Sequence, residues 1–121
     1  MKKILIVDDQ TDIRELIAET LGADEFRILK SGTGRQAVDT AKMEKPDLII
    51  MDIMMPGEID GLEATRLIKA DPRTRECHII LLSAKGQEAD RIRGKSVGAN
   101  DYFVKPFSPT DLLNKVEETL N

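Results

Sequence analysis

The sequence contains few of the residues that build covalent or metal-bound frameworks. Its single cysteine, Cys77, excludes an internal disulfide and a cysteine-based metal cage. Its single histidine, His78, has no second histidine with which to form a metal-binding pair. We therefore expect both residues to be structural, and a lone cysteine fits a reducing compartment.

The sequence also lacks the features of nucleic-acid-binding, secreted and membrane proteins. A net charge of −4 without a block of Lys and Arg argues against a broad nucleic-acid interface. No apolar stretch is long enough to cross a membrane. The apolar run after Met1-Lys2-Lys3 stops at Asp8, which is too short for the apolar core of a signal peptide. We expect a cytoplasmic protein that binds neither nucleic acid nor membranes directly.

No internal repeat, linker or low-complexity tract divides the chain. Its 121 residues, 40% hydrophobic and 33% charged, are typical of one soluble globular domain. We expect a single domain over residues 1–121, with no room for an output domain after the last helix.

Apolar strand patterns alternate with helical patterns along the chain. Strands are expected near residues 4–7, 26–30, 48–51, 79–82 and 102–104, each followed by a helix. The first helix has an apolar stripe of Ile13, Leu16, Ile17 and Leu21. The fourth, between residues 87 and 97, is the weakest, with little more than Ala89, Ile92 and Val97 and with Gly94 inside the pattern. The alternation predicts an α/β fold with a parallel sheet covered by helices on both faces.

Polar or charged residues follow four of the five strands at the point where each strand ends. Asp8 and Asp9 follow the first strand, and Asp52 closes the third. Ser83 follows the fourth strand, and Lys105 follows the fifth. In open α/β sheets ligands bind beyond the carboxyl ends of the strands, so these side chains are expected to meet at one edge.

This set of side chains suits a divalent cation and a phosphoryl group. Carboxylate oxygens are the ligands that Mg²⁺ prefers. Crowded carboxylates raise one another's pKa unless a cation offsets the repulsion, and Lys105 supplies one positive charge. The Ser83 hydroxyl and the backbone N–H groups after Asp52 and Ser83 are expected to donate to phosphoryl oxygens.

Together with their neighbours, these residues form a series of motifs in a fixed order. They are Ile4-Leu5-Ile6-Val7-Asp8-Asp9, the run from Pro46 to Gly57 that contains Asp52, Asp60-Gly61, Leu82-Ser83-Ala84, Gly98-Ala99-Asn100-Asp101-Tyr102 and Val104-Lys105-Pro106-Phe107. In this order the chain resembles the receiver domain of two-component response regulators, most closely the CheY-like kind. The resemblance implies a flavodoxin-like, doubly wound (βα)5 fold with strand order 2-1-3-4-5.

The resemblance also implies roles for individual residues. Asp52 would be the phosphoacceptor that becomes 4-aspartylphosphate. Asp9 would bind Mg²⁺ directly, Asp8 would act through metal-bound water, and Met54 would contribute its carbonyl oxygen. Lys105 would pair with the phosphoryl group, in front of a cis Lys105–Pro106 bond.

Ser83 and Tyr102 would form the switch that follows phosphorylation. The phosphodonor would be a sensor histidine kinase or a phosphotransfer protein, and the downstream protein target is not indicated. The chain would assist its own phosphotransfer and dephosphorylation without being an enzyme in the usual sense. The face formed by the fourth helix, fifth strand and fifth helix would change its partner affinity, and Asp101 and Lys115 could pair there across a phosphorylation-dependent homodimer.

The sequence departs from the family pattern at several positions. The loop over residues 56–61 is one residue longer than usual, which leaves its geometry beside the metal site open. His78 replaces a proline that often opens the fourth strand. Met54 and Lys85 occupy the positions that tune dephosphorylation in the family.

Other interpretations remain open from the residues alone. Asp8 and Asp9 could initiate a helix, Asp52 could cap a loop, and Tyr102 could be sheet packing. A Mg²⁺-dependent phosphohydrolase with an aspartate nucleophile is one alternative function. A receiver-like interaction module that is never phosphorylated is another.

Overall fold

The computed structural model describes residues 1–84 and 87–121. Lys85, at one of the positions expected to tune dephosphorylation, therefore lies outside the described residues. Helices and strands alternate through the chain, as predicted. The elements are β1 (Lys3–Val7), α1 (Thr11–Leu21), β2 (Arg27–Ser31), α2 (Gly34–Glu44), β3 (Leu48–Asp52), α3 (Gly61–Ala70), β4 (His78–Ala84), α4 (Glu88–Ser96), β5 (Asp101–Lys105) and α5 (Pro109–Leu120).

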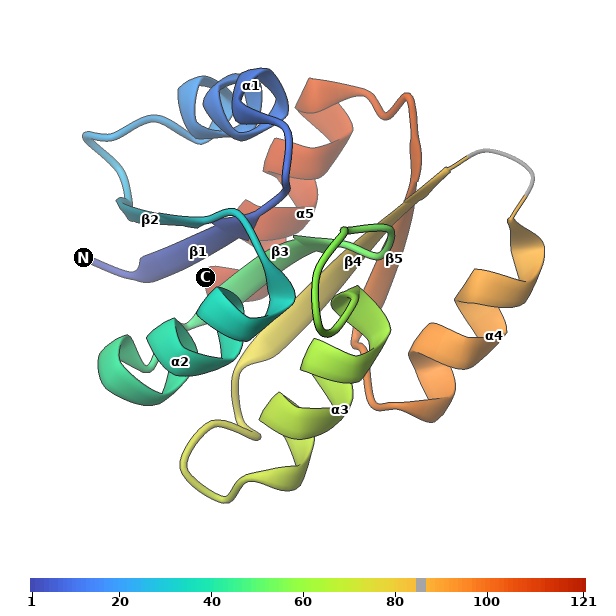
Figure 1. Ribbon diagram of the computed structural model, residues 1–121. Coiled ribbons are helices and arrows are strands. Elements are labelled where there is room, and N and C mark those ends of the chain that lie inside the picture. The colour runs from blue at the N-terminus through green and yellow to red at the C-terminus, as the bar shows by residue number, and fades with distance from the viewer. Residues whose placement is uncertain (85–86) are drawn as a thin grey trace.

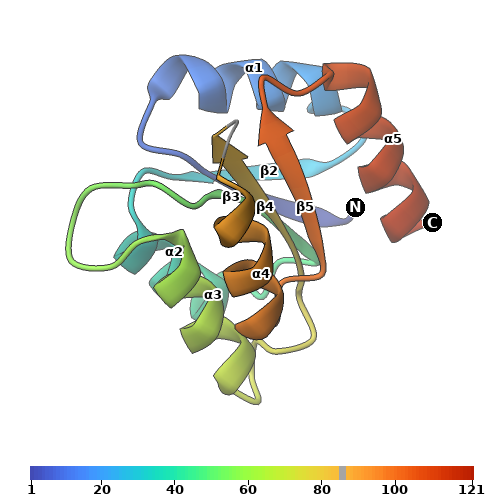
Figure 2. The ribbon, with the colours of Figure 1, turned by 90° about the vertical axis from the view of Figure 1, so that its right-hand side faces the viewer.

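The five strands form one parallel sheet in the order β2-β1-β3-β4-β5, which confirms the predicted flavodoxin-like topology. Helices α1 and α5 cover one face, and α2, α3 and α4 cover the other (Figure 1). The view along the sheet in Figure 2 shows these three layers clearly. The chain order reverses between β1 and β3, so the carboxyl ends of these strands border the crevice where this fold binds ligands.

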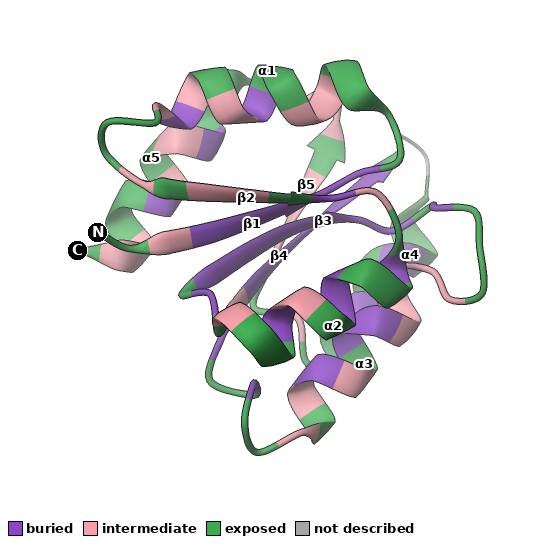
Figure 3. Cartoon of the chain, turned by 60° about the vertical axis from the view of Figure 1, so that its left-hand side comes forward, coloured by how far each residue is buried: buried purple, intermediate pink, exposed green. Residues whose placement is uncertain are grey.

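Each face of the sheet supports its own apolar core. On the α1 and α5 side, Ile6, Ile50 and Leu82 pack with Ile17 and Val116. On the opposite side, alternating residues of the same strands pack against α2 and α3. The central strands β1 and β3 are buried on both faces, as the purple strands of Figure 3 show. The continuous apolar runs therefore reflect burial on two sides rather than one.

Two helices differ from the expected burial pattern. On α1, Ile17 and Leu21 are buried, but Leu16 is 43% exposed. On α4 the buried residues are Asp90 and Gly94, whereas Ile92 is 73% exposed. A Cβ atom on Gly94 would lie 2.9 Å from the Leu81 side chain, so glycine lets α4 approach β4 closely. The fourth helix thus contacts the sheet through a glycine and a carboxylate instead of an apolar stripe.

Hydrogen bonds from side chains fix the starts of three helices. Thr33, Asp60 and Ser108 accept from the backbone N–H groups of Gln36, Glu63 and Asp111, respectively. Such caps satisfy N–H groups that have no partner within the helix. Among the described residues, no helix is long and apolar enough to span a membrane.

Candidate functional site

Three carboxylates from two adjacent strands meet at the carboxyl edge of the sheet. Oxygen atoms of Asp8, Asp9 and Asp52 all lie within 4.8 Å of one another. Asp52 is the last residue of β3, and Asp8 directly follows β1, which pairs with β3 in parallel. Asp8 is fully buried and Asp52 is 7% exposed, while Asp9 faces solvent. The structure therefore brings together the three acids that the sequence predicted would converge.

The Lys105 ammonium lies between two of these acids. Its Nζ atom is 3.1 Å from Oδ2 of Asp8 and 3.3 Å from Oδ2 of Asp52. Lys105 comes from the end of β5, which lies two strands from β3, and its side chain crosses the edge of β4. The Lys105–Pro106 peptide bond is cis, as the resemblance implied.

Burial and like charge act together on Asp52. Desolvation raises the pKa of its carboxyl group, Lys105 lowers it, and the neighbouring Asp8 raises it, with a net rise. Desolvation lowers the pKa of Lys105, but the hydrogen bond from Lys105 to Asp8 and the charges of Asp8 and Asp52 outweigh it, so that pKa is raised. The site thus holds a stable ammonium beside a carboxylate that gains from further positive charge.

The donor set fits a hard divalent cation. Among the described residues, the clustered ligand atoms are oxygens of three carboxylates, which is the chemistry that Mg²⁺ prefers. The Lys105 ammonium alone balances only part of their charge. Asp8, Asp9 and Asp52 are the residues that would hold such a cation here.

The loop after Asp52 is anchored close to the site. The N–H of Gly61 donates to the Ile53 carbonyl at 2.9 Å, and a Cβ atom on Gly61 would lie 2.2 Å from the Asp52 carbonyl oxygen. Only glycine fits this approach, so the start of α3 supports the backbone of Asp52 directly. The longer loop over residues 56–61 therefore ends at a fixed point beside the strand.

One expected donor is already used within the sheet. The backbone N–H after Asp52 belongs to Ile53 and donates to the Leu82 carbonyl at 2.9 Å. The Ile53 N–H is therefore not free for a phosphoryl oxygen, because strand pairing between β3 and β4 extends one residue past β3. The N–H of Met54 instead approaches the Asp52 carboxylate and lowers its pKa.

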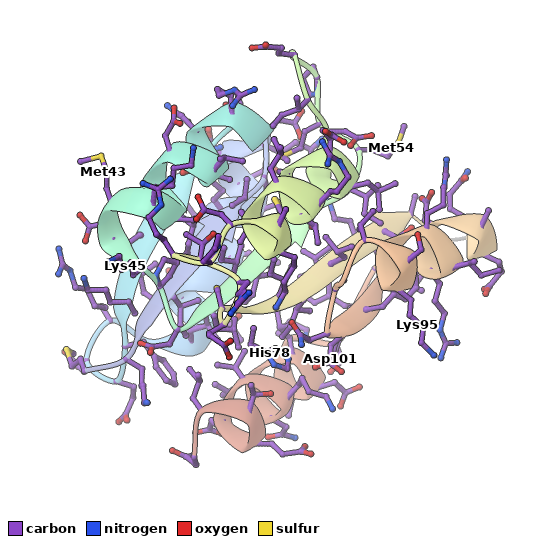
Figure 4. All side chains as sticks on the ribbon, turned by 90° about the horizontal axis from the view of Figure 1, so that it is seen from below. Met43, Lys45, Met54, His78, Lys95 and Asp101 are labelled. Carbon is purple, nitrogen blue, oxygen red and sulfur yellow. The ribbon has the colours of Figure 1, made fainter. Side chains whose placement is uncertain are left out.

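The remaining predicted site residues differ in how deeply they are buried. The Met54 side chain is 68% exposed and points away from the core in Figure 4, so only the backbone of Met54 is available to the site. Ser83 is fully buried, and its hydroxyl donates to Oδ2 of Asp90 at 3.1 Å. Tyr102 is half-buried, and its hydroxyl donates to the Gln87 carbonyl at 3.2 Å. Both expected switch side chains are thus bonded to the beginning of α4.

Two polar residues near the site were missed by the sequence analysis. Arg14 of α1 donates to the backbone carbonyl of Asp8 and to the Thr11 hydroxyl, and so holds the loop that carries Asp8 and Asp9. Asp90 is 2% exposed and bonded to Ser83. The sequence contained a signal that Asp90 is buried, because Asp90 lies four residues before Gly94 and therefore on the same face of the helix. This signal was missed because the search was for apolar residues, and an acid does not fit an apolar stripe.

Comparison with known proteins agrees with this geometry. The family model of the response regulator receiver domain matches residues 4–117. The phosphate regulon transcriptional regulatory protein PhoB of Pseudomonas aeruginosa is 44% identical over 119 residues, which are 98% of this chain and 52% of PhoB. The chain therefore spans about half the length of the curated relatives it matches.

Solved structures show the same similarity. A putative response regulator from Chloroflexus aurantiacus superposes with a TM-score of 0.91 at 32% identity, covering 98% of this chain and 97% of that one. The receiver domain of a sensor histidine kinase from P. aeruginosa PAO1, solved with a magnesium ion coordinated in the active-site cleft, has a TM-score of 0.88 at 33% identity, and the match covers 98% and 97% of the two chains. Since the family model extends from β1 into α5, the chain belongs to the receiver domains of two-component response regulators, which act in phosphorylation-based signalling.

Proposed function

We propose that this chain is a phosphorylation-activated switch in which Asp52 accepts a phosphoryl group from a histidine kinase or a phosphotransfer protein. One observation carries the proposal. The Asp52 carboxylate lies 3.3 Å from the Lys105 ammonium, and its oxygens cluster with those of Asp8 and Asp9 within 4.8 Å. This arrangement offers a nucleophile, a fixed cation and a cation-binding site around one acceptor oxygen.

The chemistry requires little covalent machinery from the protein. A carboxylate oxygen of Asp52 forms a bond to phosphorus while the phosphorus–nitrogen bond of the donor phosphohistidine breaks, and the bond electrons remain on the leaving imidazole. Lys105 balances the charge on the phosphoryl oxygens. When bound, Mg²⁺ supplies the second centre of positive charge that phosphoryl transfer needs.

The acids are proposed to have separate roles. Asp9, which faces solvent, and the Met54 carbonyl would be direct ligands of the cation. Asp8 is fully buried and paired with Lys105, so it is suited to act through a bound water and to orient the ammonium. The unit that carries out this function comprises β1 through α5, within residues 1–121.

The proposed output is a change at the face formed by α4, β5 and α5. Ser83 would turn toward the phosphoryl group, and Tyr102 would follow it inward. Helix α4 is suited to move because it buries no large apolar side chain. Within one chain, the Lys115 ammonium lies 3.8 Å from the Asp101 carboxylate. In a phosphorylation-dependent homodimer through this face, Lys115 of one chain would instead pair with Asp101 of the other.

The direct test is mass spectrometry after incubation with Mg²⁺ and a small acyl-phosphate donor. We expect one added phosphoryl group on the wild type and none on Asp52→Ala. Asp47→Ala is the matched control, because Asp47 is a carboxylate at the opposite end of the same strand. No gain on the wild type, or an equal gain in Asp52→Ala, would remove the proposal.

A second measurement separates a switch from a hydrolase. A switch takes up one phosphoryl group and releases it once. Sustained release of phosphate over many turnovers from a metabolite phosphate would instead favour a phosphohydrolase with the same nucleophile.

A further inference from the structure

Asp90 is a buried carboxylate to which the proposed phosphotransfer chemistry gives no role. It lies in the first turn of α4 and is 2% exposed. Its two oxygens have different partners: the Arg93 guanidinium bonds Oδ1, and the Ser83 hydroxyl donates to Oδ2 at 3.1 Å. Burial of a carboxylate is costly unless the group is paired and hydrogen-bonded, so both partners offset the cost of burying Asp90.

The bond to Ser83 bears directly on the switch. A serine hydroxyl carries one proton that it can donate. Carboxylate and phosphoryl oxygens are both acceptors, so Ser83 cannot donate to Asp90 and to a phosphoryl group on Asp52 at the same time. Among the described residues, the other acceptor near this hydroxyl is the Ala84 carbonyl at 3.4 Å, which is a longer contact.

We propose that Asp90 is a positioning residue that holds the Ser83 hydroxyl in the unphosphorylated arrangement and so sets the threshold for activation. This inference rests on the proposed function of Ser83 and Asp52. Phosphorylation must break the Ser83–Asp90 hydrogen bond, and Asp90 then keeps its contact with Arg93. Asp90 therefore opposes activation, and it lies on α4, the helix that has to move.

A second contact joins the same helix start to the other switch residue. The Tyr102 hydroxyl donates to the Gln87 carbonyl at 3.2 Å, immediately before α4. Ser83 and Tyr102 therefore both bond the N-terminal end of α4 from neighbouring strands. When Ser83 leaves Asp90, one of these two hydrogen bonds to the start of α4 is lost. This loss links the phosphorylation site to the α4 part of the output face.

The test measures the affinity of the full chain for beryllofluoride, a stable mimic of a phosphoryl group on a carboxylate, in the presence of Mg²⁺. Titration followed by amide NMR shifts gives the dissociation constant. Loss of one hydrogen bond in the resting state corresponds to about fivefold in an equilibrium constant. We expect Asp90→Ala to bind beryllofluoride about fivefold more tightly than the wild type.

A double-mutant cycle separates this role from a merely structural one. In the Ser83→Ala background, the Asp90→Ala substitution should no longer change the affinity, because the hydroxyl that Asp90 holds is gone. Glu88→Ala is the matched control, since it removes an acid from the same turn of α4 without a hydrogen bond to Ser83. It should bind like the wild type.

If Asp90→Ala does not fold, Asp90→Asn keeps the shape but replaces a charged acceptor with a weaker neutral one, and we expect about twofold tighter binding. Unchanged affinity in the folded Asp90 variant would overturn the inference, as would the same gain in the Ser83→Ala background. A wild type that binds no beryllofluoride would overturn the proposed function as well, so the two failures are distinguishable.

Discussion

At the amino ends of the strands, carboxylates are paired with hydrogen-bond donors or cations. At the carboxyl ends, the described residues gather three carboxylates, and the Lys105 ammonium contacts two of them, Asp8 and Asp52. Asp47 accepts from the Lys3 backbone N–H at 2.8 Å. Asp101 lies 2.6 Å from the His78 ring and 3.8 Å from the Lys115 ammonium. Figure 4 shows His78 and Asp101 side by side at this end, beside α5.

The difference between the two ends separates charge that stabilises the fold from charge that remains available for a ligand. Matched pairs on a surface contribute little and attract nothing further. Crowded acids with a raised pKa, as at Asp52, stay ready for additional positive charge. Both edges of the sheet are rich in polar residues, so polarity alone does not identify the functional edge. The excess of carboxylates over cations identifies it.

Removing the shared ammonium should have the largest effect. Lys105→Ala leaves Asp8 and Asp52 as unpaired like charges, and we expect a loss of about 2–3 kcal/mol in the free energy of unfolding at pH 7, measured by urea denaturation. Lys115→Ala at the other end is the matched control, and its loss should stay within about 1 kcal/mol. Equal losses would abolish the contrast between the ends.

The Lys105→Ala loss should also depend on pH with a definite sign. The folded-state pKa of Asp52 is already raised, and removal of Lys105 raises it further. A carboxyl group with a raised pKa stabilises the fold when protonated, and that stability is lost as the pH rises through the folded pKa. The difference between Lys105→Ala and the wild type should therefore shrink as the pH is lowered through this value.

Magnesium should stabilise the protein through one end only. At about five times its dissociation constant, Mg²⁺ should raise the free energy of unfolding by about 1 kcal/mol. Asp9→Asn should lose most of this gain, whereas Asp47→Asn should keep it, because Asp47 lies at the amino end of β3 and its side chain accepts from the Lys3 backbone N–H. A Mg²⁺ response that survives in Asp9→Asn would place the cation elsewhere.

Without a bound cation, the Asp52 carboxylate should lower the free energy of unfolding. Because burial and Asp8 raise the pKa of Asp52, the ionised form is less favourable in the folded state. Asp52→Asn should therefore be more stable than the wild type in EDTA, by less than the magnesium effect. Thermal unfolding with and without Mg²⁺ measures this, and a less stable Asp52→Asn in EDTA contradicts it.

The smallest effect is expected at Cys77, near the amino end. Burial raises the pKa of its thiol to about 12, and the thiolate is the reactive form. A thiol reagent at pH 8 should label the folded protein at least about tenfold more slowly than the urea-unfolded chain. Cys77→Ala should leave the Mg²⁺ response unchanged, and a loss of that response would show that the two ends are coupled.

Local signals in the sequence were sufficient for the order of helices and strands and for the membership of the acidic cluster, whereas the strand order came from the family resemblance. The order of apolar runs and helical stripes predicted all ten elements in sequence. Asp8, Asp9, Asp52 and Lys105 could be grouped because parallel strands place their carboxyl ends at one edge. These predictions needed only periodicity and the position of each residue relative to a strand end.

The sequence by itself thus determined the layers, the strand ends and the residues that gather at one edge, because hydrophobic periodicity is a local property of the chain. Only the tertiary structure decided which partner each polar group takes. It joined Ser83 to Asp90, His78 to Asp101 and the Ile53 N–H to Leu82, and it left Leu16 and Ile92 exposed. A hydrogen bond depends on distances of a few tenths of an ångström between distant segments, and no local pattern encodes them.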